Sequence, residues 1–341
     1  MITPEFSLFS LTYACNNRCK WCYASPERYA QKTMPAADAK GYIRLCHSLK
    51  IKDIGFLGGE PTLVKGIEGL VRYAADNGIR VTLYTNGRRL SDRSFAMRLK
   101  DSGVFCINVG VQSADAGEHD SVTGIPGSFS ETLEGIRNCR DLGIDMRILT
   151  VVSCPDPSRY ARMIDRFREY TGHFVFFREL PDVSKYSEQP MLPNRATAEV
   201  MRGLFLHAER RGIKVSLYTR MPLCWFRRAD AEDMIRAGAL MNFCHVAHGL
   251  ALNINPDGAV TPCVNMTGVM MTDLKRGGRT VGRDEFLKEW NSRRLEGARD
   301  MLGRLRHSAC SRCSLWGPFC SGGCPLVKFE LGPYVREYSM G

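Results

Sequence analysis

The sequence predicts an α/β fold in which a partial (β/α)6 barrel is followed by a small cysteine-rich domain with a β-hairpin. The first observation is that residues 6–180 alternate short β-rich runs with amphipathic patterns, a unit that occurs six times. Such alternation is typical of a parallel sheet, and six units are too few for a complete eight-unit barrel. The second observation is that most of the 14 cysteines gather near the two ends of the 341-residue chain. Without an export signal, this grouping indicates metal ligands and not disulfides.

The β-rich and amphipathic runs define the expected elements in chain order. The expected strands are Phe6–Tyr13, Asp53–Leu57, Arg80–Thr85, Phe105–Gln112, Asp145–Val152 and His173–Leu180, with Lys214–Thr219 as a further candidate. The expected helices are Ala36–Leu49, Ile67–Asn77, Ser91–Ser102, Ser130–Leu142, Ser158–Tyr170 and Arg195–Arg211. Asp257-Gly258, between two alternating runs, predicts the hairpin. We therefore expect a TIM-like partial barrel at residues 1–185, a bridge at 186–240 and the cysteine-rich domain at 241–341.

The charge and the hydropathy pattern indicate whether the protein binds nucleic acid or a membrane. Forty-seven Lys and Arg against 36 Asp and Glu give a net charge of +11, which raises the question of nucleic acid. Aromatic residues are not interleaved with the basic run at 273–312, as a single-strand binder needs, so we do not expect nucleic acid. No window reaches the roughly 18 apolar residues of a membrane span. The start also lacks the basic region of a signal peptide, so we expect a cytoplasmic protein that contacts no membrane.

Three cysteines lie within eight residues directly after the first expected strand, in Cys15-Asn-Asn-Arg-Cys19-Lys-Trp21-Cys22. Three thiols in one loop can ligate three irons of a cubane and leave the fourth iron without a protein ligand. The alternative is zinc, but a structural zinc site needs four ligands and no fourth lies nearby in the sequence. The triplet therefore favours an iron–sulfur cluster with an open iron.

A second motif, Gly58-Gly59-Glu60-Pro61, follows the second expected strand. Barrel enzymes keep their active sites at this carboxyl edge of the sheet. Glycines allow a ligand to approach the backbone, and a carboxylate can bind an ammonium group. Thr85-Asn86 and Gln112-Ser113 close the third and fourth strands at the same edge.

On these motifs and this strand order, the chain resembles the radical S-adenosylmethionine (radical SAM) enzymes through about residue 180. The resemblance implies that Cys15, Cys19 and Cys22 bind a [4Fe–4S] cluster whose fourth iron is chelated by S-adenosylmethionine. One electron from such a cluster breaks a carbon–sulfur bond, and the resulting 5′-deoxyadenosyl radical abstracts hydrogen. The implied cofactor contacts are Trp21 at the adenine, Gly58, Gly59 and Glu60 at the methionyl end, and Ser113 at the ribose. Further candidates, for which a purely structural role is equally open, are Thr85, Asn86 and Arg147.

Six more cysteines follow the hairpin region, in the patterns Cys244-x13-Gly258-x4-Cys263 and Cys310-x2-Cys313-x6-Cys320-x3-Cys324. A CxxC pair with two further cysteines is a strong metal signal for which zinc and iron–sulfur are both open. The set also resembles the SPASM extension of radical SAM enzymes, which holds two auxiliary [4Fe–4S] clusters through seven cysteines. The resemblance assigns Cys244, Cys263 and Cys324 to the cluster nearer the substrate, and Cys310, Cys313 and Cys320 to the outer cluster.

The sequence departs from the SPASM pattern because six residues precede Cys320 and no cysteine follows Cys324. The fourth ligand of the outer cluster is therefore open among Glu330, Glu337, Cys224 and none. A single shared auxiliary cluster is another alternative, and Cys224 can equally be a buried thiol that binds nothing. The cluster nearer the substrate also shows three ligands, which leaves room for an open iron.

The resemblance implies a radical SAM oxidoreductase that modifies a peptide or protein side chain by cross-link, thioether formation or dehydrogenation, as in the maturation of ribosomally made peptides. The alternatives are a dehydrogenase or epimerase of a small metabolite and, in another class, a zinc-stabilised nucleic-acid-binding protein. The expected cofactors are S-adenosylmethionine, its [4Fe–4S] cluster and one or two auxiliary [4Fe–4S] clusters. Val264 follows Cys263 where anaerobic sulfatase maturases carry Asp, so we do not expect formylglycine formation.

The expected partners are a peptide or small-molecule substrate and an external one-electron donor of the flavodoxin or ferredoxin type. Because Cys15 leaves no room for a leader-binding domain ahead of the barrel, a separate peptide-recognition protein also fits. The acid or base is left unassigned among Glu118, Glu179 and Asp182, which lie near strand ends.

Overall fold

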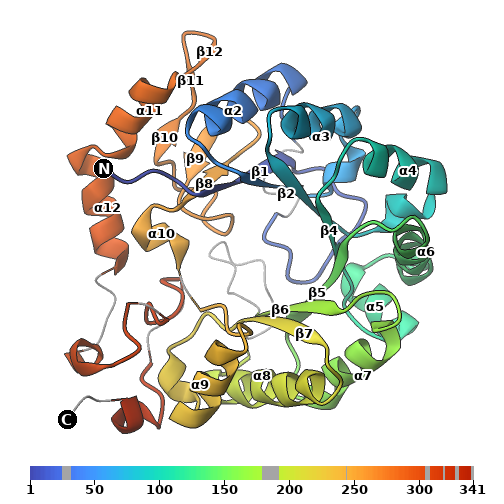
Figure 1. The fold of residues 1–341 in the computed structure, drawn as a ribbon, viewed down its shortest axis with the longest axis vertical. Helices are drawn as coiled ribbons and strands as arrows, with labels where there is room; N and C mark the ends of the chain where they lie inside the picture. Colours follow the sequence, from blue (N-terminus) through green and yellow to red (C-terminus); the bar gives the residue numbers. More distant parts are fainter. Residues whose placement is uncertain are drawn as a thin grey trace.

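In the computed structural model, ten strands form one curved sheet in the order β10-β9-β8-β1-β2-β3-β4-β5-β6-β7 (Figure 1). The structure describes residues 1–24, 32–178, 192–242, 244–303, 308–317, 319–326 and 330–338. The strands of this sheet are β1 Phe6–Thr12, β2 Asp53–Gly58, β3 Arg80–Thr85, β4 Cys106–Gly110, β5 Met146–Val152, β6 His173–Arg178, β7 Lys214–Tyr218, β8 Ala251–Ile254, β9 Ala259–Thr261 and β10 Thr272–Asp273. A separate two-stranded ribbon consists of β11 Lys275–Arg276 and β12 Arg279–Thr280.

The helices follow the strands in the expected alternation. The α-helices are α2 Ala36–Ser48, α3 Ile67–Asp76, α4 Arg93–Asp101, α5 Ala116–Thr123, α6 Ser128–Asp141, α7 Pro157–Phe167, α8 Asn194–Glu209, α9 Arg228–Arg236, α10 His245–His248, α11 Arg283–Trp290 and α12 Arg293–Gly303. Short 3-10 turns are η1 Pro61–Leu63, η2 Arg88–Ser91, η3 Leu223–Trp225, η4 Ser308–Arg312 and η5 Val335–Tyr338.

The predicted α/β class is confirmed, and the sheet is larger than six strands. Strands β1 to β7 are parallel neighbours, so β7 extends the barrel beyond the predicted six units. The predicted hairpin forms as the antiparallel pair β8–β9, and β8 pairs in parallel with β1. The cysteine-rich part of the chain is thereby joined to the barrel sheet. The expected barrel boundary at residue 185, and the candidates Glu179 and Asp182, lie outside the described residues.

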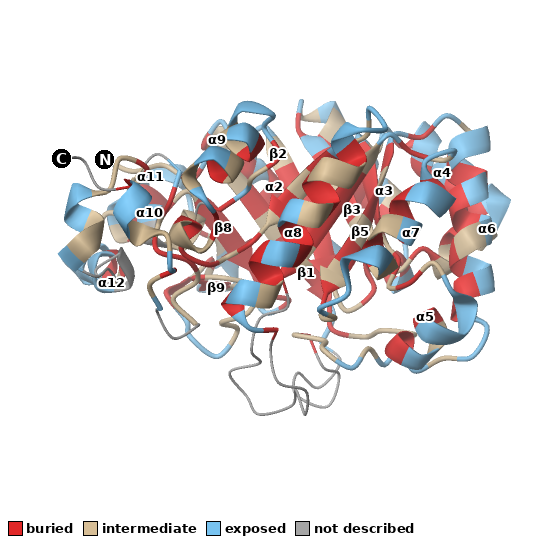
Figure 2. Cartoon of the chain, turned by 90° about the horizontal axis from the view of Figure 1, so that it is seen from below, coloured by how far each residue is buried: buried red, intermediate tan, exposed pale blue. Residues whose placement is uncertain are grey.

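Helices cover the convex side of the sheet and bury one face each (Figures 1 and 2). In α7, Tyr160, Met163, Ile164 and Phe167 recur at helical spacing and are all buried. Its first turn is fixed by Asp156, whose side chain accepts a hydrogen bond from the Ser158 backbone N–H at 2.9 Å. The barrel thus follows from the alternation of apolar helix faces with parallel strands.

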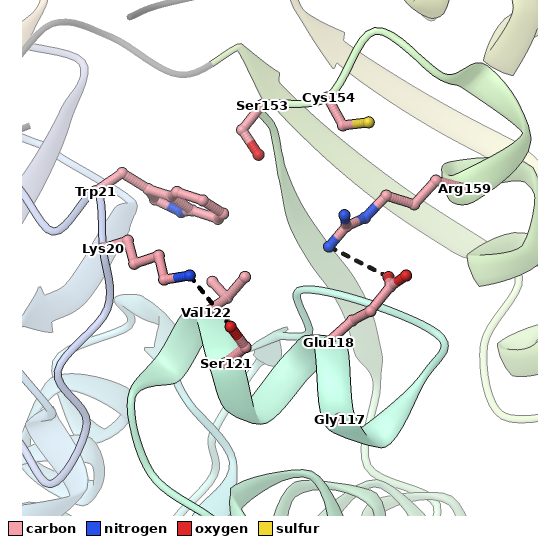
Figure 3. Close-up of a pocket in the computed structure, with 9 residues that line it drawn as sticks. All are labelled: Lys20, Trp21, Gly117, Glu118, Ser121, Val122, Ser153, Cys154 and Arg159. Atoms are coloured by element: carbon pink, nitrogen blue, oxygen red, sulfur yellow. Dashed lines mark hydrogen bonds and ion pairs between the residues drawn. The ribbon is translucent and has the colours of Figure 1, made fainter. Parts of the chain in front are cut away.

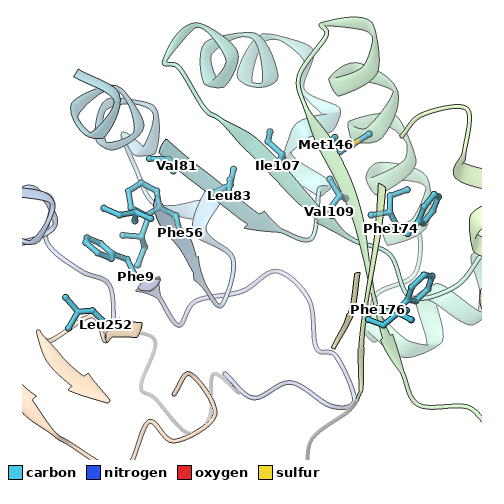
Figure 4. Close-up of a cluster of buried hydrophobic side chains, with 14 of the residues drawn as sticks. Phe9, Phe56, Val81, Leu83, Ile107, Val109, Met146, Phe174, Phe176 and Leu252 are labelled. Atoms are coloured by element: carbon cyan, nitrogen blue, oxygen red, sulfur yellow. The ribbon is translucent and has the colours of Figure 1, made fainter. Parts of the chain in front are cut away.

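The core lies between the sheet and these helices (Figure 4). Alternate residues of β5 are buried, as expected for a strand with one face toward the helices. Phe9 and Phe56 pack at a ring separation of 5.7 Å, and both are fully buried. Among the described residues, no helix is long and apolar enough to cross a bilayer.

We expect Phe56→Ala to lower the free energy of unfolding by about 3–5 kcal/mol, because it leaves a cavity in the core that cannot collapse fully. Chemical denaturation of both variants and the wild type measures this. Phe105→Ala is the matched control, because the Phe105 side chain is 43% exposed and lies against the Arg80 guanidinium, so its loss should cost about 1 kcal/mol or less. Equal losses in the two variants would contradict the assignment of this core.

Candidate functional site

The cysteine triplet lies in the loop after β1, at the carboxyl edge of the sheet. Burial raises the pKa of the Cys15 thiol to about 12, and the nearby Glu60 and Cys22 raise it further. Burial also raises the pKa of Cys19, and the neighbouring Cys22 and Cys15 thiols raise it further. The three thiols are therefore close together, and burial favours the protonated form of Cys15 and Cys19. Iron must displace these protons, so cluster binding should strengthen as pH rises.

The triplet loop is held from two directions. The Arg18 and Lys20 backbone N–H groups donate to Thr123 and Val122 carbonyls at the end of α5, at 2.7 and 3.1 Å. From β3, the Asn86 side-chain amide donates to the Asn16 side-chain oxygen at 2.6 Å. Arg88 donates to the Asn16 carbonyl and, at 3.1 Å, to the Asn17 side-chain oxygen. Neighbouring elements thus fix the loop before any metal is bound.

The Glu60 carboxylate is 1% exposed and accepts four hydrogen bonds. One oxygen accepts from the Thr62 backbone N–H, the Thr62 hydroxyl and the Thr85 hydroxyl, at 3.0, 2.6 and 2.7 Å. The other accepts from the Asn86 backbone N–H at 2.7 Å. Burial raises the pKa of Glu60 although these four donors favour the charged form. In this structure Glu60, Thr85 and Asn86 therefore join the ends of β2 and β3.

Gly58 and Gly59 allow the ends of β1 and β2 to touch. A Cβ on Gly58 would lie 2.2 Å from the Thr12 carbonyl oxygen, and a Cβ on Gly59 would lie 2.3 Å from the Ala14 carbonyl oxygen. The Gly59 and Glu60 backbone N–H groups donate to these same carbonyls at 2.6 and 2.8 Å. The two glycines therefore allow close approach of the backbone that leads into the triplet loop, and their contact with the methionyl end of the cofactor stays a prediction.

A cavity of about 400 Å³ lies beside the triplet loop (Figure 3). Trp21 stands on one side, α5 on another, and the end of β5 on a third. The lining residues are Lys20, Trp21, Gly117, Glu118, Ser121, Val122, Ser153, Cys154 and Arg159. Such a space suits a nucleoside between an aromatic ring and polar groups.

Glu118 is the acidic group of this cavity. Its carboxylate accepts from the Ser113 hydroxyl at 2.6 Å and pairs with Arg159 at 3.4 Å. Ser113 is 2% exposed, and its hydroxyl is used by the hydrogen bond to Glu118. The Glu118 side chain, which is 45% exposed, is the one of the two that faces the cavity. The sequence placed Ser113 and Glu118 near a strand end, but no motif pointed to Arg159, because Arg159 comes from α7 and meets Glu118 only in the folded chain.

The loop between β4 and α5 is anchored by His119. This ring is fully buried, and its Nδ1 accepts the Gln112 backbone N–H at 3.2 Å. Burial lowers the pKa of His119 to about 4. The ring is therefore neutral at physiological pH, and its hydrogen bond to Gln112 ties α5 to the segment that follows β4.

Arg147 lies on β5, away from this cavity. It is opposite Asn108 in the strand register, and its charge influences the pKa values of Tyr84, Cys106 and His173. Arg147 is thus grouped with side chains of β3, β4 and β6, while Trp21, Ser113 and Glu118 share the cavity region.

The carboxy-terminal cysteines separate into two groups. Burial raises the pKa of the Cys324 thiol to about 11, and Cys263 and Cys244 raise it further. Burial likewise raises the pKa of Cys320 to about 11, with Cys224 and Cys313 as its thiol neighbours. The expected inner set of three is therefore brought together, and the expected outer set is joined by a fourth thiol.

The carboxy-terminal thiols suit a metal centre by their chemistry. Among the described residues, no three His, Cys, Asp or Glu side chains converge so as to hold one metal ion. Buried, neighbouring cysteine thiols are ligands of both structural zinc and iron–sulfur clusters, so both kinds of centre are open for these two groups.

Arg178, at the end of β6, was not predicted as a site residue. It is 2% exposed, and one of its terminal nitrogens donates to the Leu192 carbonyl at 2.9 Å. Its Nε and other terminal nitrogen have no hydrogen-bond partner among the residues that the structure describes. Burial lowers the pKa of Arg178 to about 10, while Cys324 and Glu330 favour its charge. This cation therefore lies at the mouth of the barrel next to the inner cysteine group.

Comparison with known proteins identifies the class. Residues 9–167 match the family described as the radical SAM superfamily. The chain is 32% identical to the Fe-coproporphyrin III synthase of Methanosarcina barkeri, over 96% of this chain and 89% of that protein. It is 23% identical to the mycofactocin maturase MftC of Mycolicibacterium smegmatis, over 96% of this chain and 80% of that protein. The chain belongs to the radical SAM superfamily and is an enzyme, so the nucleic-acid-binding alternative is dropped.

Other similarities cover part of a relative or only the fold. The chain is 33% identical to the AdoMet-dependent heme synthase of Nitratidesulfovibrio vulgaris, over 44% of this chain and only 41% of that protein. The crystal structure of Streptococcus suis SuiB bound to precursor peptide SuiA superimposes with a TM-score of 0.71 at 17% identity, covering 98% of this chain and 72% of that one. The fold is therefore shared over nearly the whole chain.

We expect Glu118→Gln to weaken the binding of S-adenosylmethionine about tenfold, because a neutral amide is a poorer acceptor for ribose hydroxyls and loses its pairing with Arg159. Equilibrium binding to the reconstituted protein measures the dissociation constant. Glu134→Gln is the control, since Glu134 is half-exposed and pairs with Arg137 on the surface, outside the cavity. Equal affinities of all three proteins would remove Glu118 from the cofactor site.

His119 makes a pH-dependent contribution to stability with a defined sign. Its pKa in the folded protein, about 4, is below the ordinary value of 6.5, so the unfolded chain takes up the proton first. The contribution is present above about pH 6.5 and is lost as pH falls toward 4. Between pH 7 and pH 5 we expect wild type to lose about 2 kcal/mol more than His119→Gln. Denaturation at both pH values checks this, with the exposed His47→Gln as control; a wild-type slope equal to that of His119→Gln would refute it.

Proposed function

We propose that this enzyme carries out a net oxidation of a peptide or protein side chain, with auxiliary [4Fe–4S] clusters as electron acceptors. The observation that carries the proposal is the grouping of Cys244, Cys263 and Cys324 next to Arg178 at the end of β6. The triplet loop opens at the same edge of the sheet, after β1. An acceptor near the place where a substrate radical forms suits a reaction that removes two electrons in two steps.

Each residue of the site has a proposed part. Cys15, Cys19 and Cys22 hold the first cluster, Trp21 and Glu118 enclose the nucleoside, and Glu60 fixes the loop at the methionyl end. When bound, S-adenosylmethionine and its cluster would supply a hydrogen-abstracting 5′-deoxyadenosyl radical, and clusters held by the carboxy-terminal cysteines would supply an acceptor for the second electron. The proton that the substrate loses with this electron would go to the Glu118 carboxylate, the acidic side chain of the cavity.

The separation of the carboxy-terminal cysteines into two groups supports two auxiliary clusters over one shared cluster. The Cys324 thiol has Cys244 and Cys263 as neighbours, while the Cys320 thiol has Cys224 and Cys313. This division matches the SPASM-type assignment of the inner set. We accordingly propose domain limits of 1–185, 186–240 and 241–341, with the last region as the SPASM-like domain.

The peptide substrate is supported by two similarities. SuiB, which shares the fold over 98% of this chain, binds a precursor peptide, and MftC, similar over 96% of it, is a maturase. A chain that acts on a ribosomally made peptide would use a flavodoxin or ferredoxin type donor, and a separate recognition protein where the peptide has a leader.

A second candidate substrate is a tetrapyrrole that carries carboxylates. Fe-coproporphyrin III synthase is similar to this chain at 32% identity over nearly the full length of both. The buried Arg178, with two nitrogens that have no partner among the described residues, suits a carboxylate at the mouth of the barrel. This candidate is the specific form of the small-metabolite alternative.

The test is anaerobic turnover of the reconstituted protein with S-adenosylmethionine and dithionite. We expect 5′-deoxyadenosine release to rise at least tenfold with a matching precursor peptide, whose mass falls by about two units through the loss of two hydrogens. Cys15→Ala should abolish release, and Cys139→Ala, a buried thiol outside all three groups, should not change it. A rise with carboxylated iron porphyrins and with no peptide would instead establish the second candidate.

A further inference from the structure

The fourth ligand of the outer cysteine group is one of the points that the sequence pattern left open. Cys310, Cys313 and Cys320 supply three thiols. We propose that Cys224, which precedes the whole cysteine-rich region, is the fourth ligand of the outer cluster. The inference rests on the auxiliary clusters of the proposed function and assigns one residue to one of them.

Cys224 lies in η3, the short turn that follows β7, and this turn contacts the outer cysteines directly. The backbone N–H of the adjacent Leu223 donates to the Cys320 sulfur. The Cys224 thiol in turn interacts electrostatically with Cys310 and Cys313. The backbone N–H of Cys313 donates to the Cys310 carbonyl at 3.2 Å, which keeps these two residues in one turn. The Cys224 thiol and the thiols of Cys310, Cys313 and Cys320 are therefore neighbours.

The sulfur atoms of this group are surrounded by backbone donors. The Gly332 N–H donates to the Cys224 sulfur at 3.1 Å, and the Gly322 N–H donates to the Cys320 sulfur at 3.4 Å. Hydrogen bonds from backbone N–H groups to ligating sulfurs are among the features that set the potential of iron–sulfur clusters. A core cysteine that binds nothing needs no such donor, because it packs as a small apolar side chain.

The end of the chain holds the Cys224 turn in place. A Cβ on Gly332 would lie 2.1 Å from the Cys224 carbonyl oxygen, so only glycine allows this approach. The Tyr334 N–H donates to the same carbonyl at 3.1 Å. The Tyr338 hydroxyl donates to the Leu223 and Phe226 carbonyls at 3.1 and 2.9 Å. Residues 332–338 thus hold the turn that carries Cys224.

The competing carboxylates have other partners. Glu330 accepts from the Asn194 side-chain amide at 3.3 Å and is exposed. Glu337 accepts from the Arg228 backbone N–H at 2.8 Å, at the start of α9. Among the four options that the sequence left open, Cys224 is the group whose thiol neighbours are the outer cysteines.

The test counts iron in a full-length chain that cannot form the first cluster. Cys15→Ala, Cys19→Ala and Cys22→Ala together remove the triplet, so two auxiliary clusters should leave about eight irons per chain. Adding Cys224→Ala should either lower the iron content to about four per chain, or leave the outer cluster in place with an iron that no residue ligates. In the second case both auxiliary clusters have an open iron, because the inner cluster already has three ligands. Ferricyanide oxidation then converts both to [3Fe–4S], so the electron paramagnetic resonance signal doubles from about one spin per chain to about two. Either result supports the assignment.

Matched variants make the result specific. Cys310→Ala, which removes an expected ligand of the same cluster, should behave like Cys224→Ala, and Cys139→Ala should behave like the background. Cys224→Ser keeps the size of the side chain, so a change in the oxidised signal there reports ligation even where the alanine variant folds poorly. Iron content and signal unchanged in both Cys224 variants would overturn the inference. A background chain that binds no iron would instead overturn the auxiliary clusters of the proposed function.

Discussion

Glu60 joins three strand ends, its carboxylate linking β2 to β3 and its backbone N–H linking β2 to the segment after β1, and the arrangement of the barrel mouth depends on it. Its four donors come from η1 and from the end of β3, and the backbone of its own loop is bonded to the segment that leads from β1 into the triplet. Burying a charged group is costly unless its hydrogen bonds are complete. The full set of donors therefore fixes the loop after β2 that carries Glu60. Backbone hydrogen bonds from this loop then hold the segment that leads into the cysteine triplet.

The features that could be predicted from the sequence are those in which neighbours along the chain are also neighbours in space. The triplet is three thiols in one loop, so its spacing alone indicates a cubane. Gly58, Glu60, Thr85 and Ser113 lie at strand ends, and parallel strands bring such ends to one edge. The strand–helix alternation predicted the class of fold for the same reason, since it repeats locally.

The remaining features depend on contacts between distant segments. Glu118 meets Arg159 through α5 and α7, and β8 pairs with β1 across more than two hundred residues of chain. The turn after β7 is the clearest case, because the Cys324 N–H donates to the Arg220 carbonyl at 3.0 Å while Leu223 contacts Cys320. One short segment thus touches both auxiliary groups, which a list of cysteine spacings does not reveal.

The most direct measurement is X-ray diffraction from crystals of the reconstituted protein at the iron absorption edge. We expect three cluster-sized anomalous peaks: one enclosed by Cys15, Cys19 and Cys22, one by Cys244, Cys263 and Cys324, and one by Cys310, Cys313, Cys320 and Cys224. Iron at the triplet alone, with single zinc ions among the carboxy-terminal cysteines, would contradict it.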